Sequence, residues 1–217
     1  GWTPKRMLRK NAYIGRSNHG NDAYFDGSIS DVSIIDGKAL SADEVVEMML
    51  VVPFKWMFPL TALEGGNGGN PFVTSTGANT GQLSATVHQG AQLGDGRIEG
   101  GGAKALAFNG VGKTPDDGQH VSIDGGMTFG GGALSLCAWA KWSAFGVWSR
   151  IVDIGNGPNS DNILLSNNVH SHNRDLVPIN TSILLGMYSP CNFPAFAHNH
   201  HLIVCVCSSV DVYPRCQ

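Results

Sequence analysis

Charged residues are scarce in this chain, since they make up 14% of its 217 residues and only four of them are glutamates. Glycine is abundant, with 29 residues. Few glutamates and many glycines disfavour a helical fold. Short apolar runs separated by glycine-rich turns instead predict an all-β sandwich or barrel.

A basic surplus and a long hydrophobic run are both missing. The formal net charge is -3, which leaves no basic face to neutralise phosphates, so we expect no nucleic-acid partner. No apolar run reaches the roughly 18 residues of a membrane helix, so we expect no membrane insertion of this chain. The sequence also begins without an initiator Met or a signal-like segment, which leads us to expect a fragment of a longer protein.

Sequence patterns that carry catalysis are scarce as well. The chain has no G-x-S-x-G elbow to anchor a hydrolase triad. The run GVGKT at 110–114 has the wrong spacing for a phosphate-binding loop. Because turn residues follow it at once, we expect a hairpin loop there.

Cysteine is unevenly distributed. Cys137 stands alone inside an apolar run and is expected to be a small buried hydrophobe. Four others crowd near the C-terminal end, at Cys191, Cys205, Cys207 and Cys216. They could form disulfides in a secreted protein, with a pairing that the sequence leaves open. A zinc site is disfavoured because Cys205 and Cys207 have C-x-C spacing rather than C-x-x-C.

The stretch DGSISDVSIIDGKALSADEV at 26–45 contains a strand pattern with one irregularity. Ile29, Val32 and Ile34 would share one buried face, which strict two-residue alternation does not allow. One extra residue near Ser30 and Asp31 restores the parity, so we predict a β-bulge.

A short helix is predicted after this strand, near residues 41–49. Asp36 and Gly37 form a turn pair that ends the strand. Ser41 and Glu44 then have the spacing of a capping box, in which each side chain accepts a hydrogen bond from the other residue's backbone N–H.

Five further runs predict strands between glycine-rich turns. "ALSLCAWAKW" is apolar on both faces until Lys141, as expected for a central strand of a layered sandwich. The five runs cover 104–110, 120–125, 133–142, 149–155 and 162–166.

Residues 11–45, NAYIGRSNHGNDAYFDGSISDVSIIDGKALSADEV, resemble the closing part of a laminin-G-like, concanavalin A-like jelly-roll module. That part runs as a strand ending in I-G, an F-x-G-x-I-x-D-V strand and A-L-S-x-x-E-V. Residues 56 to about 166 resemble the opening part of the same module. The chain departs from it in having Asn109 in the usual F-D-G, and Thr74 and Ser75 in a turn that is usually acidic.

The order of these parts implies the end of one repeat followed by the start of the next. We therefore expect a C-terminal module part at 1–50, an N-terminal module part at 51–168, and a divergent or poorly structured tail at 169–217 that is either an insertion or a gene-model artefact. The implied fold is an antiparallel jelly-roll β-sandwich. In it, the strand at 24–35 is expected to pair with strands within 56–166.

The resemblance also implies a structural Ca²⁺, held by an aspartate near the closing strand. Asp31 is the corresponding residue, with Glu64 second, and oxygen ligands of this kind suit Ca²⁺. Asp31 could equally bond backbone N–H groups of the bulge. The superfamily includes retaining glucanases, which need two carboxylates about 5 Å apart. No glutamate here has that neighbourhood, so we expect no enzyme.

An aromatic cluster in KWSAFGVWSR suggests a sugar-binding surface. Trp142 and Trp148 could stack on sugar rings, and Arg150 could bond hydroxyl groups. Asn156 and Asp161, in a polar loop, could line the same site. The alternative is that the aromatic residues pack in the core and that the loop residues only form turns.

Together these expectations describe an extracellular or cell-surface, non-catalytic module that binds a glycan or an extracellular protein beside neighbouring repeats. The alternatives are a structural spacer repeat of a large adhesion protein and a degenerate relative of the glycoside hydrolases.

Overall fold

The computed structural model describes most of the chain between residues 4 and 166 and short pieces beyond. The described residues are 4–41, 43–44, 72–75, 81–95, 104–112, 114, 117–158, 160–166, 184–185, 196–198 and 201–208. This part consists of antiparallel β-sheets, as the composition predicts. Among the described residues no helix is long and apolar enough to cross a membrane.

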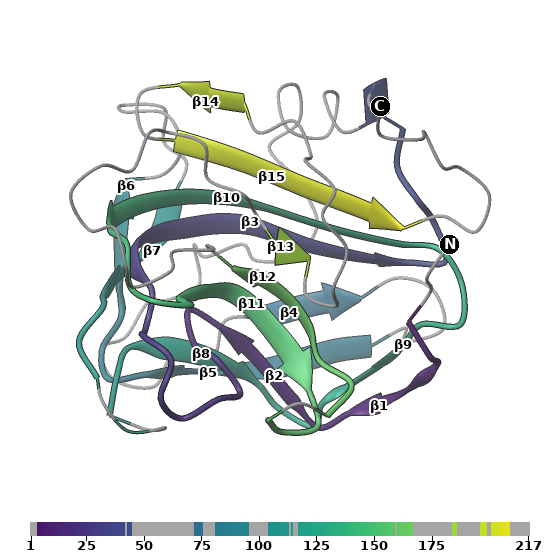
Figure 1. Cartoon of the computed structure of the whole chain (residues 1–217), viewed down its shortest axis with the longest axis horizontal. Coiled ribbons are helices and arrows are strands. Elements are labelled where there is room, and N and C mark those ends of the chain that lie inside the picture. The colour runs from purple at the N-terminus through teal and green to yellow at the C-terminus, as the bar shows by residue number, and fades with distance from the viewer. Residues whose placement is uncertain are drawn as a thin grey trace.

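Two large sheets face each other (Figure 1). The six-stranded sheet has the order β14 (Phe196–His198), β15 (His201–Ser208), β10 (Leu134–Ala144), β3 (Asp26–Asp36), β7 (Lys104–Asn109) and β6 (Gln92–Asp95). The seven-stranded sheet has the order β13 (Leu184–Leu185), β12 (Ile163–Ser166), β11 (Arg150–Gly155), β2 (Asn11–Ile14), β8 (His120–Ile123), β5 (Gly81–His88) and β4 (Phe72–Ser75). A small ribbon pairs β1 (Met7–Arg9) with β9 (Met127–Phe129).

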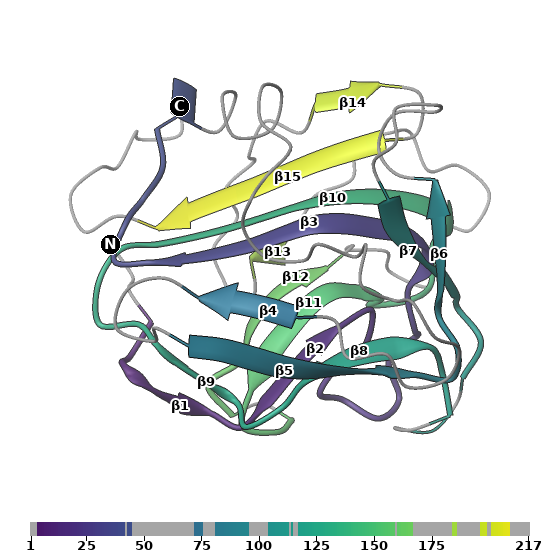
Figure 2. The ribbon, with the colours of Figure 1, turned by 180° about the vertical axis from the view of Figure 1, so that it is seen from behind.

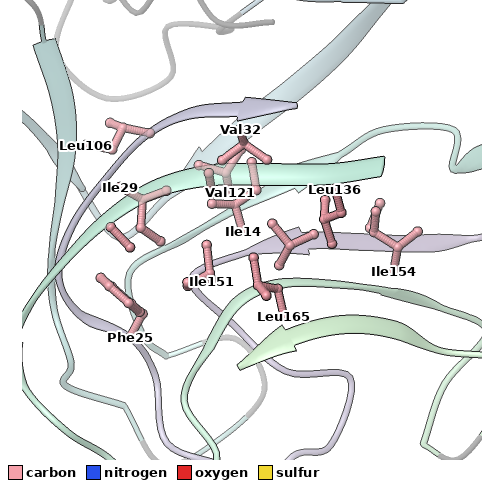
Figure 3. Packing of buried hydrophobic residues seen from close by; sticks show 14 of the residues in the cluster. Ile14, Phe25, Ile29, Val32, Leu106, Val121, Leu136, Ile151, Ile154 and Leu165 are labelled. Atoms are coloured by element: carbon pink, nitrogen blue, oxygen red, sulfur yellow. The ribbon is translucent and has the colours of Figure 1, made fainter. Parts of the chain in front are cut away.

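The core lies between the two large sheets, where apolar side chains from both meet (Figure 3). Ile29, Leu106 and Leu136 come from the six-stranded sheet, and Ile14 and Leu165 come from the seven-stranded one. All five are less than 5% exposed. Burial of this apolar surface is the main stabilising contribution to such a sandwich.

The five runs predicted as strands between 104 and 166 are all strands. They form β7, β8, β10, β11 and β12. β10 lies between β15 and β3, so the expectation of a central strand is confirmed. Its residues Leu136, Ala138 and Ala140 face the core.

The opening residues occupy central places in both sheets. β3 pairs with β10 on one side and with β7 on the other. β2 lies between β11 and β8. The predicted pairing of the strand at 24–35 with strands within 56–166 is therefore confirmed. Figure 2 shows β3 and β10 side by side from the opposite direction.

The predicted bulge in β3 is present. Ser30 pairs with Trp139 and Ser33 pairs with Cys137, so Asp31 and Val32 together oppose a single residue of β10. The extra residue lets Ile29 and Val32 both face the core, at 2% and 4% exposure. Ile34 packs against the same cluster.

The predicted capping box is also formed. The backbone N–H of Ser41 donates to Glu44 Oε2 at 2.9 Å, and that of Glu44 donates to Ser41 Oγ at 3.3 Å. Residues 43–44 are helical, and the rest of the helix expected at 41–49 lies outside the described residues.

The loop that contains GVGKT does not close a hairpin, which corrects the sequence prediction. It connects β7 in one sheet to β8 in the other. Packing explains the crossing, because the loop folds around the ring of Tyr24. A Cβ at either Gly112 or Gly118 would lie 2.6 Å from that ring, and Tyr24 Oη donates to Thr114 O at 2.8 Å.

Parts of the segment 169–217 belong to the sheets. β15 pairs with β10 from Leu134 to Lys141, and β13 pairs with β12. Cys137 is fully buried, as expected, but it is also disulfide-bonded and is therefore more than a small hydrophobe. The division of the chain into two module parts and a tail stays a prediction.

Candidate functional site

Three loops meet at one end of the sandwich, on the left of Figure 1. They connect β2 to β3 (residues 15–25), β7 to β8 (110–119) and β10 to β11 (145–149). The backbone N–H of Ala23 in the first loop donates to Val147 O in the third at 3.1 Å. Because Tyr24 of the first loop binds the second, all three are joined. We call this region the loop end.

The loop end presents an apolar tip. Phe145 and Val147 are 45% and 38% exposed, although both are large hydrophobic residues. The Phe145 ring stacks on Trp142, with ring centroids 5.6 Å apart. Trp142 is 9% exposed and packs on Phe25 within the core, so it supports the tip from below. The tip is therefore an accessible surface on a buried base.

Trp148 is held in an unusual backbone conformation next to this tip. Its φ is +58°, a left-handed value that is rare for a bulky residue. The guanidinium carbon of Arg150 lies 5.4 Å from the centroid of its ring, within cation–π range. Local strain of this kind, of about 1–3 kcal/mol, clusters at functional sites.

A largely buried ionic cluster, formed by Arg150, Asp22 and Asp153, begins at the Arg150 side chain that contacts the Trp148 ring. Arg150 Nη2 contacts Asp22 Oδ2 at 2.8 Å, and the Arg150 side chain is only 5% exposed. Ser17 Oγ donates to the same Asp22 oxygen at 2.7 Å. This pairing fastens the β2–β3 loop to the first residue of β11.

Asp153 extends the cluster deeper into the protein. Its carboxylate accepts hydrogen bonds from Asn18 N at 2.9 Å and from Asn18 Nδ2 at 2.8 Å. Ser17 Oγ lies 3.3 Å from it and Arg150 Nε lies 3.5 Å away. Burial raises the pKa of Asp153, and the bonds from Asn18, the charge of Arg150 and the bond from Ser17 oppose that rise.

Some buried polar atoms of the cluster have no hydrogen-bond partner among the described residues. They are Arg150 Nε and Nη1, Asn18 Oδ1 and Ser149 Oγ. Such atoms in native proteins commonly bind ordered water.

Histidine and tyrosine side chains connect the β7–β8 loop to the sheet. His120 is buried, and its ring stacks on His88 with centroids 4.1 Å apart. Its Nδ1 lies 2.9 Å from Gly118 O and its Nε2 lies 3.4 Å from Arg16 Nη1. If Nδ1 carries the proton, His120 donates to the loop and accepts from Arg16. The Arg16 guanidinium carbon lies 4.4 Å from the centroid of the Tyr13 ring.

The structure divides the predicted sugar-binding residues between two places. Trp142, Trp148 and Arg150 lie at the loop end, whereas Asn156 and Asp161 lie beyond the other end of β11. The six residues of β11 separate the two groups by about 20 Å.

Asn156 and Asp161 bind the opening strands at their own end of β11. Asn156 Oδ1 accepts from Lys10 N at 3.0 Å, and its Nδ2 donates to Leu8 O at 3.1 Å. Asp161 contributes its carbonyl oxygen, which accepts from Arg9 Nε at 2.9 Å. Both residues therefore hold the turn after β11 against β1 and the residue that follows it.

The sequence prediction missed four polar residues of the loop end: Ser17, Asn18, Asp22 and Asp153. The run SNHGND at 17–22 carries a signal, because polar turn residues are concentrated there. Asp153 carries none, because it lies between the apolar residues Val152 and Ile154 of β11.

The two predicted calcium ligands are Asp31 and Glu64. The backbone of Asp31 lies in the bulge of β3, its side chain is not described, and Glu64 lies outside the described residues. Within the described part of the chain, no three His, Cys, Asp or Glu side chains come together as a metal site would need. Calcium binding stays a prediction.

Comparison with family models found no match, and comparisons with curated proteins and with solved structures found no significant match.

Two acidic residues lie together at the loop end. Asp22 and Asp153 share Ser17 as a hydrogen-bond donor, so two carboxylates lie near each other. Asp153 is fully buried, however, and a general acid or nucleophile must reach its substrate. The carboxylates position the loops, and the exposed side chains are available for contact.

Proposed function

We propose that the chain is a non-catalytic recognition module with a concanavalin A-like jelly-roll fold, working outside the cell or at its surface, and that its loop end binds a carbohydrate. The observation that carries the proposal is the aromatic tip, where Phe145 is exposed on the buried Trp142 and Trp148 lies over Arg150. A sugar offers an apolar ring face and a rim of hydroxyl groups, which suit aromatic rings and neighbouring polar groups.

The strand arrangement supports the jelly-roll part of the proposal. In this chain the closing part of a module precedes the opening part of the next. To complete one sandwich, the strands near the start of the chain must pair with strands that come later in the chain. β2 and β3 do so, each between two strands that come later in the chain. The capping box also forms within the A-L-S-x-x-E-V segment of the resemblance.

A glycan array on the purified chain tests the binding. We expect glycans to bind the wild type, and Phe145→Ala and Trp148→Gly to weaken binding at least tenfold. Glycine tolerates the left-handed φ of residue 148, so the second variant removes the ring without adding backbone strain. Leu8→Ala is the matched control, because Leu8 is 46% exposed and lies in β1, beside the turn after β11.

The outcomes separate the alternatives. Binding that both loop-end variants retain would refute the assignment of the site. An array with no bound glycan would favour a structural spacer repeat or a module that binds a protein. Size-exclusion chromatography of the chain mixed with neighbouring repeats would reveal a complex between them. Release of reducing sugar from a bound glycan would favour the degenerate hydrolase.

We also propose a structural Ca²⁺ near the bulge of β3, with the Asp31 carboxylate as one ligand together with backbone carbonyl oxygens. A carboxylate on an irregular strand segment fits the oxygen ligands of this ion. Calcium is expected to raise the melting temperature of the wild type and to leave that of Asp31→Asn unchanged. Titration calorimetry that shows no heat, with no thermal shift, would refute the proposal.

A further inference from the structure

The disulfide of Cys137 lies at an informative place in the six-stranded sheet. Its neighbours Leu136 and Ala138 belong to the core cluster. Because successive side chains of a strand point to opposite faces, the side chain of Cys137 lies on the face turned away from the core. It is nevertheless completely buried and disulfide-bonded.

The register of β10 and β15 identifies a partner. Cys205 lies directly opposite Cys137, whereas Cys207 lies opposite Ser135. In an antiparallel pair, directly opposed Cα atoms are about 4.5–5.5 Å apart and diagonal neighbours about 7–8 Å. A disulfide needs a Cα separation of about 4.4–6.8 Å. Of the two cysteines in β15, Cys205 meets this requirement and Cys207 does not.

We infer that Cys137 and Cys205 form a cross-strand disulfide that fastens β15 to the sandwich. Two thiols lose two protons and two electrons as the S–S bond forms, and a disulfide oxidant such as oxidised glutathione takes up the electrons. This chemistry belongs to an oxidising compartment. The inference rests on the strand register and stands independently of the proposed glycan binding.

The bond has a structural consequence for the edge of the sheet. While it is intact, β15 covers one side of β10 from Leu134 to Lys141. When it is reduced, β15 loses this covalent attachment to β10. Release of β15 would then turn β10 into an edge strand with unpaired backbone groups. The disulfide therefore makes the attachment of the C-terminal segment sensitive to redox conditions.

Disulfide mapping on the full chain tests the assignment. The protein is prepared without reductant, its free thiols are alkylated, and the tryptic peptides are sequenced by mass spectrometry. One tryptic peptide contains Cys191, Cys205 and Cys207 together, so fragmentation at Val206 must separate the last two. We expect Cys137 linked to Cys205. A link to Cys191, Cys207 or Cys216, or an alkylated Cys137, would overturn the inference.

Two variants give a second readout. Reductant is expected to lower the melting temperature of the wild type by roughly ten degrees. Cys205→Ser should melt at the lower temperature in both conditions, and Cys207→Ser, as the matched control, should keep the response to reductant. If Cys207→Ser loses the response and Cys205→Ser keeps it, the register argument is wrong. If a variant fails to fold, the mapping of the wild type decides.

Discussion

Replacing Arg150 with methionine tests whether the buried cluster holds the loop end together. Methionine keeps much of the length and apolar surface of the arginine side chain but removes its charge. Asp22 then loses the contact at 2.8 Å, and Asp153 loses the guanidinium 3.5 Å away. The β2–β3 loop would remain attached to Asp153 of β11 through hydrogen bonds from Ser17 and Asn18.

The burial of each group sets the size of the effect. Removing one partner of a buried ion pair costs about 3–5 kcal/mol, because a charge is left uncompensated. The Asp153 side chain is 0% exposed, but that of Asp22 is 17% exposed and can regain water. We therefore expect the lower end, a loss of about 3 kcal/mol at pH 7. For a chain of this length it corresponds to a fall in melting temperature of about 6–12 °C.

The loss should depend on pH in a defined direction. Burial raises the pKa of Asp153 in the wild type, so the contribution of this group to stability is fully present below the unfolded pKa of about 3.9. It is lost as pH rises through the folded pKa. Without Arg150 the ionised form loses an attraction, and the pKa rises further. Urea unfolding of Arg150→Met should therefore show a large deficit at pH 7 that shrinks toward pH 4.

Two comparisons make the test decisive. Asp153→Asn in the Arg150→Met background removes the stranded charge and should recover a substantial part of the loss at pH 7. Arg6→Met removes an exposed ion pair with Asp36 and should cost less than about 1 kcal/mol. A deficit that is equal at pH 7 and pH 4, with no recovery in the double variant, would refute the account of the cluster.

The capping box and two glycines give further predictions. Ser41→Ala should lower the free energy of unfolding by about 1 kcal/mol in urea titrations, and an unchanged midpoint would mean that the cap contributes nothing. Hydrogen bonds from Lys38 and then Ser41 lower the pKa of Glu44 from 4.5 to about 2. The contribution of Glu44 to stability should therefore be complete above pH 4.5 and disappear toward pH 2. An NMR titration of the Glu44 carboxyl group would show the lowered pKa. Gly27→Ala would place a Cβ 1.9 Å from a backbone oxygen of β10 and should lower the free energy of unfolding by about 2 kcal/mol or more. Gly37 also has a positive φ but has open space around it, so Gly37→Ala should cost about 1 kcal/mol. Equal losses of stability in the two variants would contradict the steric explanation.

Local patterns predicted much of the fold. Alternating apolar residues bounded by glycine turns identified β7, β8, β10, β11 and β12, because side-chain period and turn chemistry are short-range properties. The bulge at Asp31 followed from parity alone, because three apolar residues had to share one face. The ribbon of β1 and β9 escaped prediction, since three-residue strands carry too few side chains to show a period.

The candidate site could be predicted only in part. The aromatic residues around Phe145 drew attention because they are close together in the sequence. Asn156 and Asp161 follow Phe145 by 11 and 16 positions, but the length of β11 carries them to the opposite end of the sandwich. The contacts between Asp22 and Arg150 join residues more than one hundred positions apart, and pairing over such distances is set by the tertiary fold and not by local pattern.

The central position of β3 has a consequence for how the protein is made. Asp36 pairs with Leu134, so roughly one hundred residues must leave the ribosome before β3 can meet β10, which at about 5–20 residues per second takes several seconds. Contacts of such long range also slow folding itself. During synthesis the apolar side chains of Ile29 and Val32 stay exposed until β10 has been made. Nascent chains of this protein should therefore depend on chaperones that cover exposed strands.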